Sequence, residues 1–494
     1  MVNDQPFNDK KIILSLQKDE LNHQFALLVE SFTTKQEFEQ LTKLLNWLSD
    51  YKNDFNNILN NNNNMVSKID IFEKLGLQYD GKFKNLLHKI ISDDVNNIDE
   101  ALLILKKKQE YSDKGIILKN FRIASKNIIT LLGTIKINRT NLRPKTRLDV
   151  LKLNTTENLH SITPLDEYLG INRLPFKMTI GAMLEIAYWV QRSNSYEEAE
   201  EGLQKYTRIN VKKDTIRLVT NNVGKLVFEN DFKQAEKSFE ILNKGNLSFP
   251  SKKLNHDFYI ECDGAMFHTR ERDENGYTWK ENKLGMVFCS DTFLSWKNKK
   301  TDKREIRIGN REYTAYAGSV DIFQKLLFNI AIQNGYGQYK NTILISDGAM
   351  WIKNMKELCF PDAVHILDFF YLCENINKFA KEYFNENKDI YEPWVADLCQ
   401  KLKNSEIKSV LDILNSLNRK TINKCSFNLL NYINKNINSI DYKLYIDNGW
   451  FIGSGAIESA NKIVLQERLK QAGMRWNIET ARYIIALMTK VKSK

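Results

Sequence analysis

The chain has few of the residues that build thiolate metal sites. Among 494 residues there are six cysteines and six histidines. No Cys-x-x-Cys pair occurs, and the histidines do not lie at zinc-ligand spacing from the cysteines. Reduced thiols are therefore expected, and a structural zinc site is not.

Long apolar runs are also missing. No stretch of about 18 uncharged apolar residues occurs, which argues against a transmembrane helix. The first residues have no basic start followed by an apolar stretch, so no secretion signal is expected. Hydrophobic residues make up 42% and charged residues 27%, as in an ordinary globular protein. We predict a cytoplasmic protein of two to four domains.

Positive charge is present and unevenly distributed. The net charge is +11, and three segments together carry +14. Residues 205–225 hold +5, residues 296–312 hold +4 and residues 453–494 hold +5, which leaves −3 for the rest. Such localised charge is typical of a protein that follows a phosphate backbone.

Three acidic residues far apart in the chain stand in frames of small residues. Asp263 ends Tyr-Ile-Glu-Cys-Asp, Asp347 ends Ile-Leu-Ile-Ser-Asp, and a glycine follows each. Both are predicted at strand ends where the backbone turns sharply, although Asp-Gly is also a common turn former without further function. Glu458, in Gly-Ser-Gly-Ala-Ile-Glu, lies in a helix-like run. Three carboxylates of this kind can hold divalent metal for phosphodiester chemistry.

Helical spacing of apolar residues dominates the N-terminal part. It covers residues 10–59, is interrupted by the asparagines 60–64, and resumes over residues 69–132. This region is predicted to serve as scaffold or dimer contact, with DNA contact as the alternative. Residues 133–147 then alternate as in a strand or hairpin.

A helix pair is predicted next. One helix begins with Ser195 as N-cap and Glu198 in the capping-box position, and a second covers residues 212–226. Lys212, Lys213 and Arg217 on the second helix would suit a helix-turn-helix that reads DNA. Ordinary helical packing is the competing interpretation.

The order of elements in the central region indicates the fold. Strands are predicted at residues 258–262, 284–289 and 304–315, followed by a helix at 320–334, a strand at 342–346, a helix from 349, a strand at 364–367 and a helix at 369–384. This is the order of an α/β ribonuclease-H-like fold with a mixed sheet. Its first and fourth strands lie side by side and parallel, which would make Asp263 and Asp347 neighbours.

These patterns divide the chain into six regions. They are an all-helical region at 1–130, a strand and loop connector at 131–178, a helix-turn-helix-like DNA-binding domain at 179–250, the first part of the catalytic core at 251–389, a helical insertion at 390–452, and a catalytic helix with a basic tail at 453–494.

Several sequence blocks, taken together, resemble a known family. They are Tyr-Ile-Glu-Cys-Asp263-Gly, Trp279-Lys-Glu-Asn-Lys-Leu-Gly-Met-Val-Phe, Ser346-Asp347-Gly-Ala-Met-Trp351-Ile, His365-Ile-Leu-Asp368-Phe-Phe, and Gly453-Ser-Gly-Ala-Ile-Glu458 through Gly473-Met-Arg-Trp476. Over residues 130–490 they resemble the acidic-triad (DDE) transposases of bacterial insertion sequences, closest to the ISKra group.

The resemblance implies a ribonuclease-H-like catalytic domain that recognises terminal inverted repeats and cuts and joins DNA. By motif, Asp263, Asp347 and Glu458 fall on the catalytic and metal-binding triad, which would hold two Mg²⁺ ions, with Mn²⁺ able to substitute. The expected partners are double-stranded DNA, as element ends and target, and a second copy of the chain on that DNA. A membrane partner and a small-molecule substrate are not expected. The protein would be bacterial, cytoplasmic and nucleoid-associated when on DNA.

The chain departs from its relatives at two points. They often carry a histidine where Tyr371 stands here, and many carry a cysteine pair before Pro164 that this chain lacks, so ordinary packing would have to replace a zinc-stabilised ribbon.

Other residues allow two interpretations each. Asp368 and Glu374 could assist the metal site, or be a helix cap and a solvated charge. Trp351 could stack on an unpaired base or belong to the core. Four cations after the triad helix are predicted phosphate contacts, with a solvated face as the alternative: Lys462, Arg468, Lys470 and Arg475.

The expected function is therefore DNA transposition by an Asp-Asp-Glu enzyme. A transposase-derived protein that binds DNA without cutting, and a metal-dependent nuclease that cuts without joining, are the alternatives.

Overall fold

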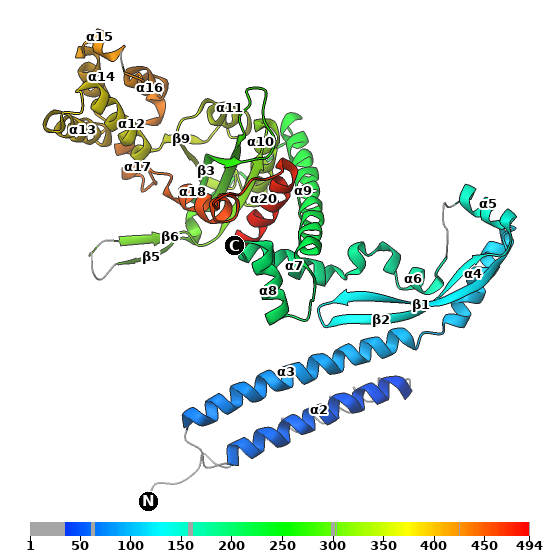
Figure 1. Ribbon diagram of the computed structural model, residues 1–494. Coiled ribbons are helices and arrows are strands. Elements are labelled where there is room, and N and C mark those ends of the chain that lie inside the picture. Colours follow the sequence, from blue (N-terminus) through cyan, green and yellow to red (C-terminus); the bar gives the residue numbers. More distant parts are fainter. Residues whose placement is uncertain are drawn as a thin grey trace, which may run out of the picture. The chain divides into compact units, whose positions relative to one another are not determined.

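A computed structural model describes residues 35–60, 65–156, 162–297, 302, 304–423 and 425–493 (Figure 1). The chain divides into two compact units. Unit 1 comprises Met1–Ala182 and Tyr206–Asn210, and unit 2 comprises Met183–Lys205 and Val211–Lys494. The part of the predicted dimer contact that precedes residue 35 lies outside the described residues.

Unit 1 combines helices with a long two-stranded ribbon. The helices α2 and α3 pack against each other, and the strands β1 and β2 pair antiparallel. Its elements are α2 (Lys35–Asn60), α3 (Met65–Asn96), α4 (Glu100–Asp113), β1 (Leu118–Thr130), β2 (Gly133–Pro144), α5 (Arg147–Thr156), α6 (Pro164–Tyr168) and the short 3₁₀ turns Ile171–Arg173 and Pro175–Lys177.

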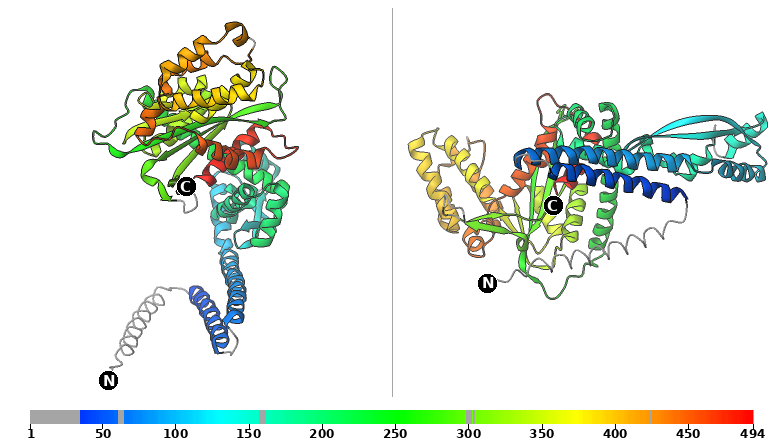
Figure 2. Two further views of the ribbon diagram at one scale, coloured as in Figure 1. Left: turned by 90° about the vertical axis from the view of Figure 1, so that its left-hand side faces the viewer. Right: turned by 90° about the horizontal axis from the view of Figure 1, so that it is seen from below.

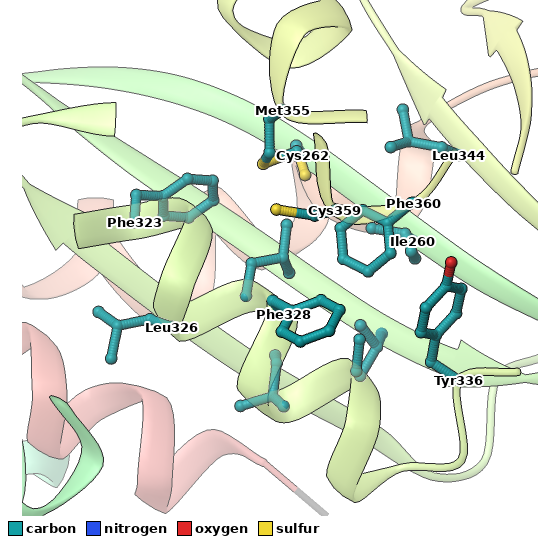
Figure 3. Packing of buried hydrophobic residues seen from close by; sticks show 14 of the residues in the cluster. Ile260, Cys262, Phe323, Leu326, Phe328, Tyr336, Leu344, Met355, Cys359 and Phe360 are labelled. Atoms are coloured by element: carbon teal, nitrogen blue, oxygen red, sulfur yellow. The ribbon is translucent and has the colours of Figure 1, made fainter. Parts of the chain in front are cut away.

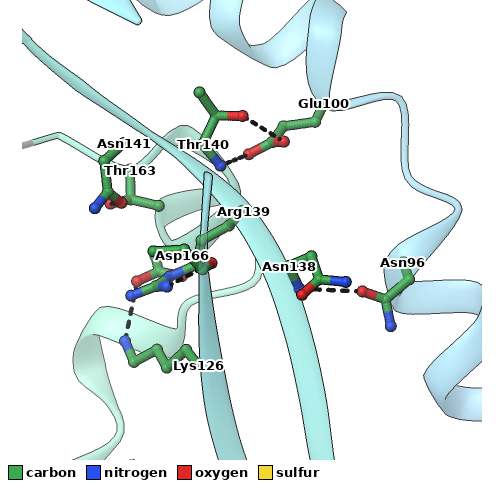
Figure 4. Close-up of polar contacts among 10 residues, drawn as sticks. Asn96, Glu100, Lys126, Asn138, Arg139, Thr140, Asn141, Thr163 and Asp166 are labelled. Atoms are coloured by element: carbon green, nitrogen blue, oxygen red, sulfur yellow. Dashed lines mark hydrogen bonds and ion pairs between the residues drawn. The ribbon is translucent and has the colours of Figure 1, made fainter. Parts of the chain in front are cut away.

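Buried polar contacts fasten the ribbon to the helices of unit 1 (Figure 4). Asp166 of α6 is only 3% exposed and pairs with Arg139 Nε at 2.8 Å and Lys126 Nζ at 3.0 Å, one cation from each strand. Glu100 at the start of α4 accepts hydrogen bonds from the backbone and hydroxyl of Thr140 at 2.5 and 3.0 Å. A buried carboxylate needs such partners to offset its lost hydration.

The ribbon corrects one prediction. The helix expected to continue to residue 132 stops at Asp113, and residues 118–130 form β1 instead. In the segment Ile123-Ala-Ser-Lys-Asn-Ile-Ile the spacing of the apolar residues fits both a helix and a strand. Pairing with β2 stabilises the strand. The connector after Pro144, predicted as strand and loop, contains the helix α5.

The helix pair is present, with a longer second helix than predicted. The helices are α7 (Ile180–Arg192), α8 (Tyr196–Tyr206) and α9 (Lys213–Asn243). Ser195 Oγ accepts from the Glu198 amide at 3.0 Å, and the Glu198 carboxylate accepts from the Asn194 amide at 2.7 Å, close to the predicted capping box. Helix α9 does not end at residue 226 but packs along α10 and α20. At Gly224 the backbones come so close that a Cβ would lie 2.6 Å from the Tyr483 carbonyl oxygen.

Unit 2 is built on a mixed five-stranded sheet in the order β7-β4-β3-β8-β9. The strands are β3 (Leu254–His268), β4 (Trp279–Cys289), β7 (Arg311–Ala317), β8 (Tyr339–Ser346) and β9 (Val364–Leu367). Strand β3 is antiparallel to β4 and parallel to β8, so the predicted adjacency of the first and fourth sheet strands is confirmed.

The two faces of β3 have different neighbours because side chains alternate along a strand. Phe258, Ile260 and Cys262 enter a core with α9, α10 (Val320–Gln333) and α11 (Met350–Cys359), shown in Figure 3. Burying each large apolar side chain there contributes roughly 1.5–3 kcal/mol. The intervening residues Tyr259 and Glu261 face the opposite way, toward Phe451 and the C-terminal helix α18 (Gly455–Ala460).

The predicted strand 304–315 is in fact two strands. Its first part is β6 (Arg304–Arg307), which pairs with β5 (Leu294–Lys297) in a separate hairpin, and its second part is β7. Gly309 lies between them at a close approach of two backbone segments, where a Cβ would come within 2.3 Å of the Thr292 carbonyl oxygen.

Helices fill the rest of unit 2. Between β9 and α18, the insertion (yellow to orange in Figure 2) packs mainly on itself. The remaining elements are the 3₁₀ turns Ser290–Thr292 and Ile437–Ser439, and the helices α12 (Phe369–Tyr383), α13 (Lys388–Lys403), α14 (Ile407–Ser416), α15 (Arg419–Ile422), α16 (Leu429–Lys435), α17 (Tyr442–Asp447), α19 (Glu467–Leu469) and α20 (Ile478–Lys492). Among the described helices, none is long and apolar enough to cross a membrane.

Candidate active site

Asp263 lies within β3 rather than at its end, because the strand continues to His268. The sharp turn predicted at Gly264 is therefore wrong. Alternation still places Asp263 on the same face as Glu261, toward the C-terminal helices. Its Oδ2 accepts a short hydrogen bond from the Asn461 amide, and its Oδ1 accepts from the Gly264 backbone at 2.7 Å. Burial raises the pKa of Asp263, and the neighbouring Asp347 charge raises it further.

Asp347 follows β8 directly, as predicted. Gly348 has a φ of 81°, the left-handed conformation that glycine adopts without strain, so the chain turns sharply after the carboxylate. Asp347 Oδ1 accepts from the Ala349 amide at 2.9 Å. The Asp347 carbonyl accepts from the hydroxyl of Tyr432, in the insertion, at 2.8 Å.

Glu458 lies in α18, which packs on β3 and β4. Its pKa is raised by partial burial first, and then by the charges of Asp368 and Asp263. The side chain lines a cavity of about 490 Å³ together with Glu261, Asp368 and the aromatic residue Trp450.

The sheet register relates the two aspartates. Glu261 pairs with Ile345 in the parallel ladder, so two residues further on Asp263 comes level with Asp347. Glu458 approaches from α18 closely enough for Asp263 to affect its pKa. Within the described ranges, however, no three His, Cys, Asp or Glu side chains are close enough together to hold one metal ion. The structure thus brings the two aspartates together and leaves Glu458 outside such a group.

Residues 70–493 match the family described as "Uncharacterised protein family (UPF0236)". The chain belongs to this family. The match includes all three acids of the predicted triad. No curated protein matches the chain.

In this family member, two of the cations predicted to read DNA are paired with acids of α8. Lys212 Nζ lies 2.9 Å from Glu200, and Lys213 Nζ lies 2.7 Å from Glu197. Arg217 is exposed on α9. The opposite side of α9 is buried, so only its exposed side could reach DNA.

The four predicted phosphate contacts after Glu458 fall into two groups. Lys462, Lys470 and Arg475 are exposed. Arg468 is not part of a solvated face, because it is only 3% exposed and lies between the rings of Tyr196 and Trp476, each 5.2 Å from the guanidinium carbon. The sequence could not predict this burial. Arg468 lies in α19, and a helix of three residues is too short for periodicity to separate its exposed side from its buried side.

Glu261 and Asn461 were missed as functional residues, whereas Asp368, predicted either to assist the metal site or to cap a helix, is a helix cap. Glu261 accepts from the Ile457 backbone at 2.8 Å, and burial raises its pKa to about 8. Asp368 caps α12 through the Tyr371 amide at 2.8 Å and also binds the backbone of Ser454 at 2.6 Å. Both acids therefore position the start of α18. Asn461 holds Asp263, and its spacing of three residues from Glu458 was the one available signal.

The remaining ambiguous residues have simple surroundings. Trp351 packs against the core and contacts the Phe323 ring at 5.6 Å, which confirms the core interpretation. Glu374 is an exposed charge 3.9 Å from Lys378. Burial raises the pKa of Tyr371, and the charges of Asp347 and Asp263 add to this, so the tyrosine lies near the two acids.

Proposed function

We propose that the chain is a DNA transposase of a bacterial insertion sequence, which binds terminal inverted repeats and carries out metal-dependent strand cleavage and strand transfer. The observation that carries the proposal is the level register of Asp263 and Asp347 on one sheet face, with the helix of Glu458 packed over that face. Its family is associated with transposase-like insertion-sequence proteins.

The sheet topology supports a ribonuclease-H-like core. Three antiparallel strands followed by two parallel ones, with the first and fourth adjacent, is the arrangement proposed from the sequence. In such α/β sheets functional residues gather at the ends of adjacent parallel strands.

The donor set fits a hard divalent cation such as Mg²⁺. Asp263 and Asp347 offer carboxylate oxygens, the ligands that Mg²⁺ prefers, and two neighbouring negative charges that a cation would stabilise. A cation at this place would polarise a phosphodiester and stabilise the leaving oxygen. In the geometry described above, Glu458 does not complete the set, so we propose that it joins the aspartates when DNA is bound.

The chain's own residues would prepare this site. Asn461 fixes the orientation of Asp263 through its hydrogen bond, and the Ala349 amide fixes that of Asp347. Glu261 and Asp368 hold the first residues of α18 and thereby the approach of Glu458. Exposed Lys462 and Lys470 would bind the DNA backbone nearby.

The test is a cleavage assay with the purified chain, Mg²⁺ or Mn²⁺, and labelled duplexes carrying the DNA that borders the gene. Asp347→Ala should lower cleavage by more than about a hundredfold, because losing a metal ligand costs more than losing an outer-shell partner. Asp362→Ala, an exposed aspartate of the same unit, is the matched control and should cleave normally. Cleavage that survives Asp347→Ala would refute the proposal.

The products separate the competing functions. Joined DNA identifies a transposase, whereas cut ends that are never joined identify a nuclease. Metal-independent binding without strand breakage under either cation identifies a DNA-binding protein that kept the fold. Gel filtration with and without the duplex tests the proposed homodimer on DNA.

A further inference from the structure

A second cavity lies in unit 2, apart from the carboxylates. Its volume is about 470 Å³, within the range of roughly 300–1,000 Å³ that is usual for ligand pockets. It is formed where the end of α7, the start of β7, the helical segment after Glu458 and the end of α20 meet. The polar residues that matter here are Gln191, Arg192, Arg311, Glu467, Arg468 and Lys492.

The lining carries an excess of positive charge. Three arginines and one lysine line the cavity, against the single acid Glu467. That acid lies 3.9 Å from Lys492, at the limit of an ion pair. The arginines have no carboxylate within ion-pair distance among the described residues. Positive charges gathered around a concave surface favour a bound anion.

Arg468 is the most unusual member of this lining. Arginine is almost never fully buried unless it is paired with an acid, yet Arg468 is 3% exposed. Its one hydrogen bond, from Nη1 to the Asn194 carbonyl, is 3.2 Å long. Its Nε and Nη2 are buried and have no hydrogen-bond partner among the described residues. Stacking on Tyr196 and Trp476 fixes the plane of the guanidinium without using its donors.

Other buried polar groups of the same cavity also lack partners. Gln191 is 4% exposed, and both atoms of its amide are unpaired within the described chain. Arg311 has an unpaired buried Nε. An unpaired buried polar group costs about 1–3 kcal/mol, so three such residues around one cavity indicate a binding site rather than accidental packing.

We propose that this cavity binds a phosphate group. Three guanidinium groups, one ammonium group and the Gln191 amide line it, and a phosphate offers more acceptor oxygens than a carboxylate does. The planar fork of arginine matches phosphate oxygens in pairs, which makes arginine the preferred residue for such sites.

The phosphate can come from two sources, a DNA backbone or a free phosphate compound. The first source rests on the proposed function. It is considered because the helical segment that carries Glu458 continues to Arg468. The second does not depend on it. The shared chemistry is the phosphate group itself.

The test uses the full-length chain in EDTA, so that neither metal nor cleavage takes part. Binding of inorganic pyrophosphate is measured by titration calorimetry, and a random-sequence duplex is then added as competitor. Pyrophosphate should bind once per chain, and Arg468→Gln should weaken it by about tenfold or more through the loss of charge-assisted hydrogen bonds. Arg192→Gln and Lys492→Gln, which replace less buried cations of the lining, should each weaken it by roughly threefold to tenfold.

Lys237→Gln is the matched control, because Lys237 is an exposed lysine of α9 that does not line the cavity. It should bind as the natural chain does. If the duplex displaces pyrophosphate, the source is the DNA backbone; if it does not, the source is a free phosphate compound. Absence of pyrophosphate binding, or equal binding by all four variants, would overturn the proposal. If Arg468→Gln fails to fold, the other two lining variants decide the matter.

This experiment can fail independently of the transposase assay. Cleavage that survives Asp347→Ala would remove the proposed enzyme and leave the phosphate site intact. Conversely, a cavity that binds no phosphate leaves the role of the carboxylates unaffected.

Discussion

Asn461 joins the C-terminal helices to Asp263 of the sheet. It is 3% exposed, and its amide nitrogen donates to Asp263 while its Oδ1 has no partner among the described residues. A carboxylate that binds metal needs a fixed orientation, and hydrogen bonds from neighbouring groups supply it. Asn461 is thus a positioning residue for Asp263.

Replacing this amide should reveal the role. Asn461→Ala should lower cleavage by about 10- to 100-fold, as is usual for outer-shell partners of a metal ligand, and should shift the Mg²⁺ dependence to higher concentration. The measurement is a Mg²⁺ titration of the cleavage rate. Gln466→Ala changes an exposed residue of the same helical segment and should leave the curve where it is. An unchanged Mg²⁺ curve for Asn461→Ala would show that Asp263 does not need this contact.

At the scale of elements, His365 of β9 links the sheet to the insertion. Its Nε2 lies 2.9 Å from Ser346 Oγ at the end of β8, and its Nδ1 lies 2.9 Å from Ser439 Oγ. Burial lowers the pKa of His365 to about 4, and the charges of Lys353 and Lys356 contribute. The imidazole is therefore neutral in the folded protein at neutral pH.

This depressed pKa makes stability depend on pH. The unfolded chain takes up the proton near 6.5, whereas the folded chain takes it up only near 4. The contribution of the neutral His365 imidazole to the free energy of unfolding is therefore complete above pH 6.5. It is lost as the pH falls to 4, and the loss is roughly 3 kcal/mol at most. Urea unfolding between pH 7 and pH 4 should show a smaller loss in His365→Gln than in the natural chain.

The exposed His256 provides the control for this measurement. His256→Gln should lose as much stability on acidification as the natural chain does. Equal losses in His365→Gln and His256→Gln would contradict the assignment to His365.

The elements also differ in how far the sequence could predict them. Strand β8 and helices α10 to α12 were predicted within a few residues, because their apolar patterns are long and bounded by Gly, Ser or Asp. Strand β1 was missed although its partner β2 follows it directly in a hairpin, because the spacing of its apolar residues fits a helix as well as a strand. The break between β6 and β7 was missed too, and the close approach of Gly309 to Thr292 at this break is a contact that no local pattern contains.

The candidate site was predictable to a similar extent. Asp263 and Asp347 could be paired because the predicted strand order makes β3 and β8 parallel neighbours, as they are in the structure. The burial of Arg468 could not be predicted, because it depends on Tyr196 from a helix about 270 residues earlier in the chain. The same holds for Glu261, whose partner Ile457 is 196 positions away.

On the scale of the whole molecule, the two units hold separate cores. The sheet of unit 2 is covered by α9, α10 and α11, all of which lie after residue 210. Unit 1 has its own small clusters, one around Tyr111 and Leu142 and another around Ile128 and Ile137. A hydrophobic core of its own is the main requirement for independent folding.

A chain that begins at Met183 should therefore fold alone. It keeps the sheet and its covering helices, and we expect a cooperative thermal transition by circular dichroism. A chain that begins at Leu254 is the control, because it lacks α9 with the core residues Ala235 and Phe239 and should not unfold cooperatively. A gradual transition for the longer fragment would show that unit 2 depends on unit 1.

The segment Asn461–Gln466 is a π-helix, in which each turn contains one residue more than an α-helix would. One residue corresponds to about 100° of rotation around the helix axis. Deleting one residue here would turn Asn461 and Arg468 out of phase, so that no rotation of the helix could direct the amide to Asp263 and the guanidinium to its aromatic slot at once. The extra residue of the π-helix thus sets the rotation between Asn461 and Arg468, so that one helical segment contacts both Asp263 and the phosphate cavity.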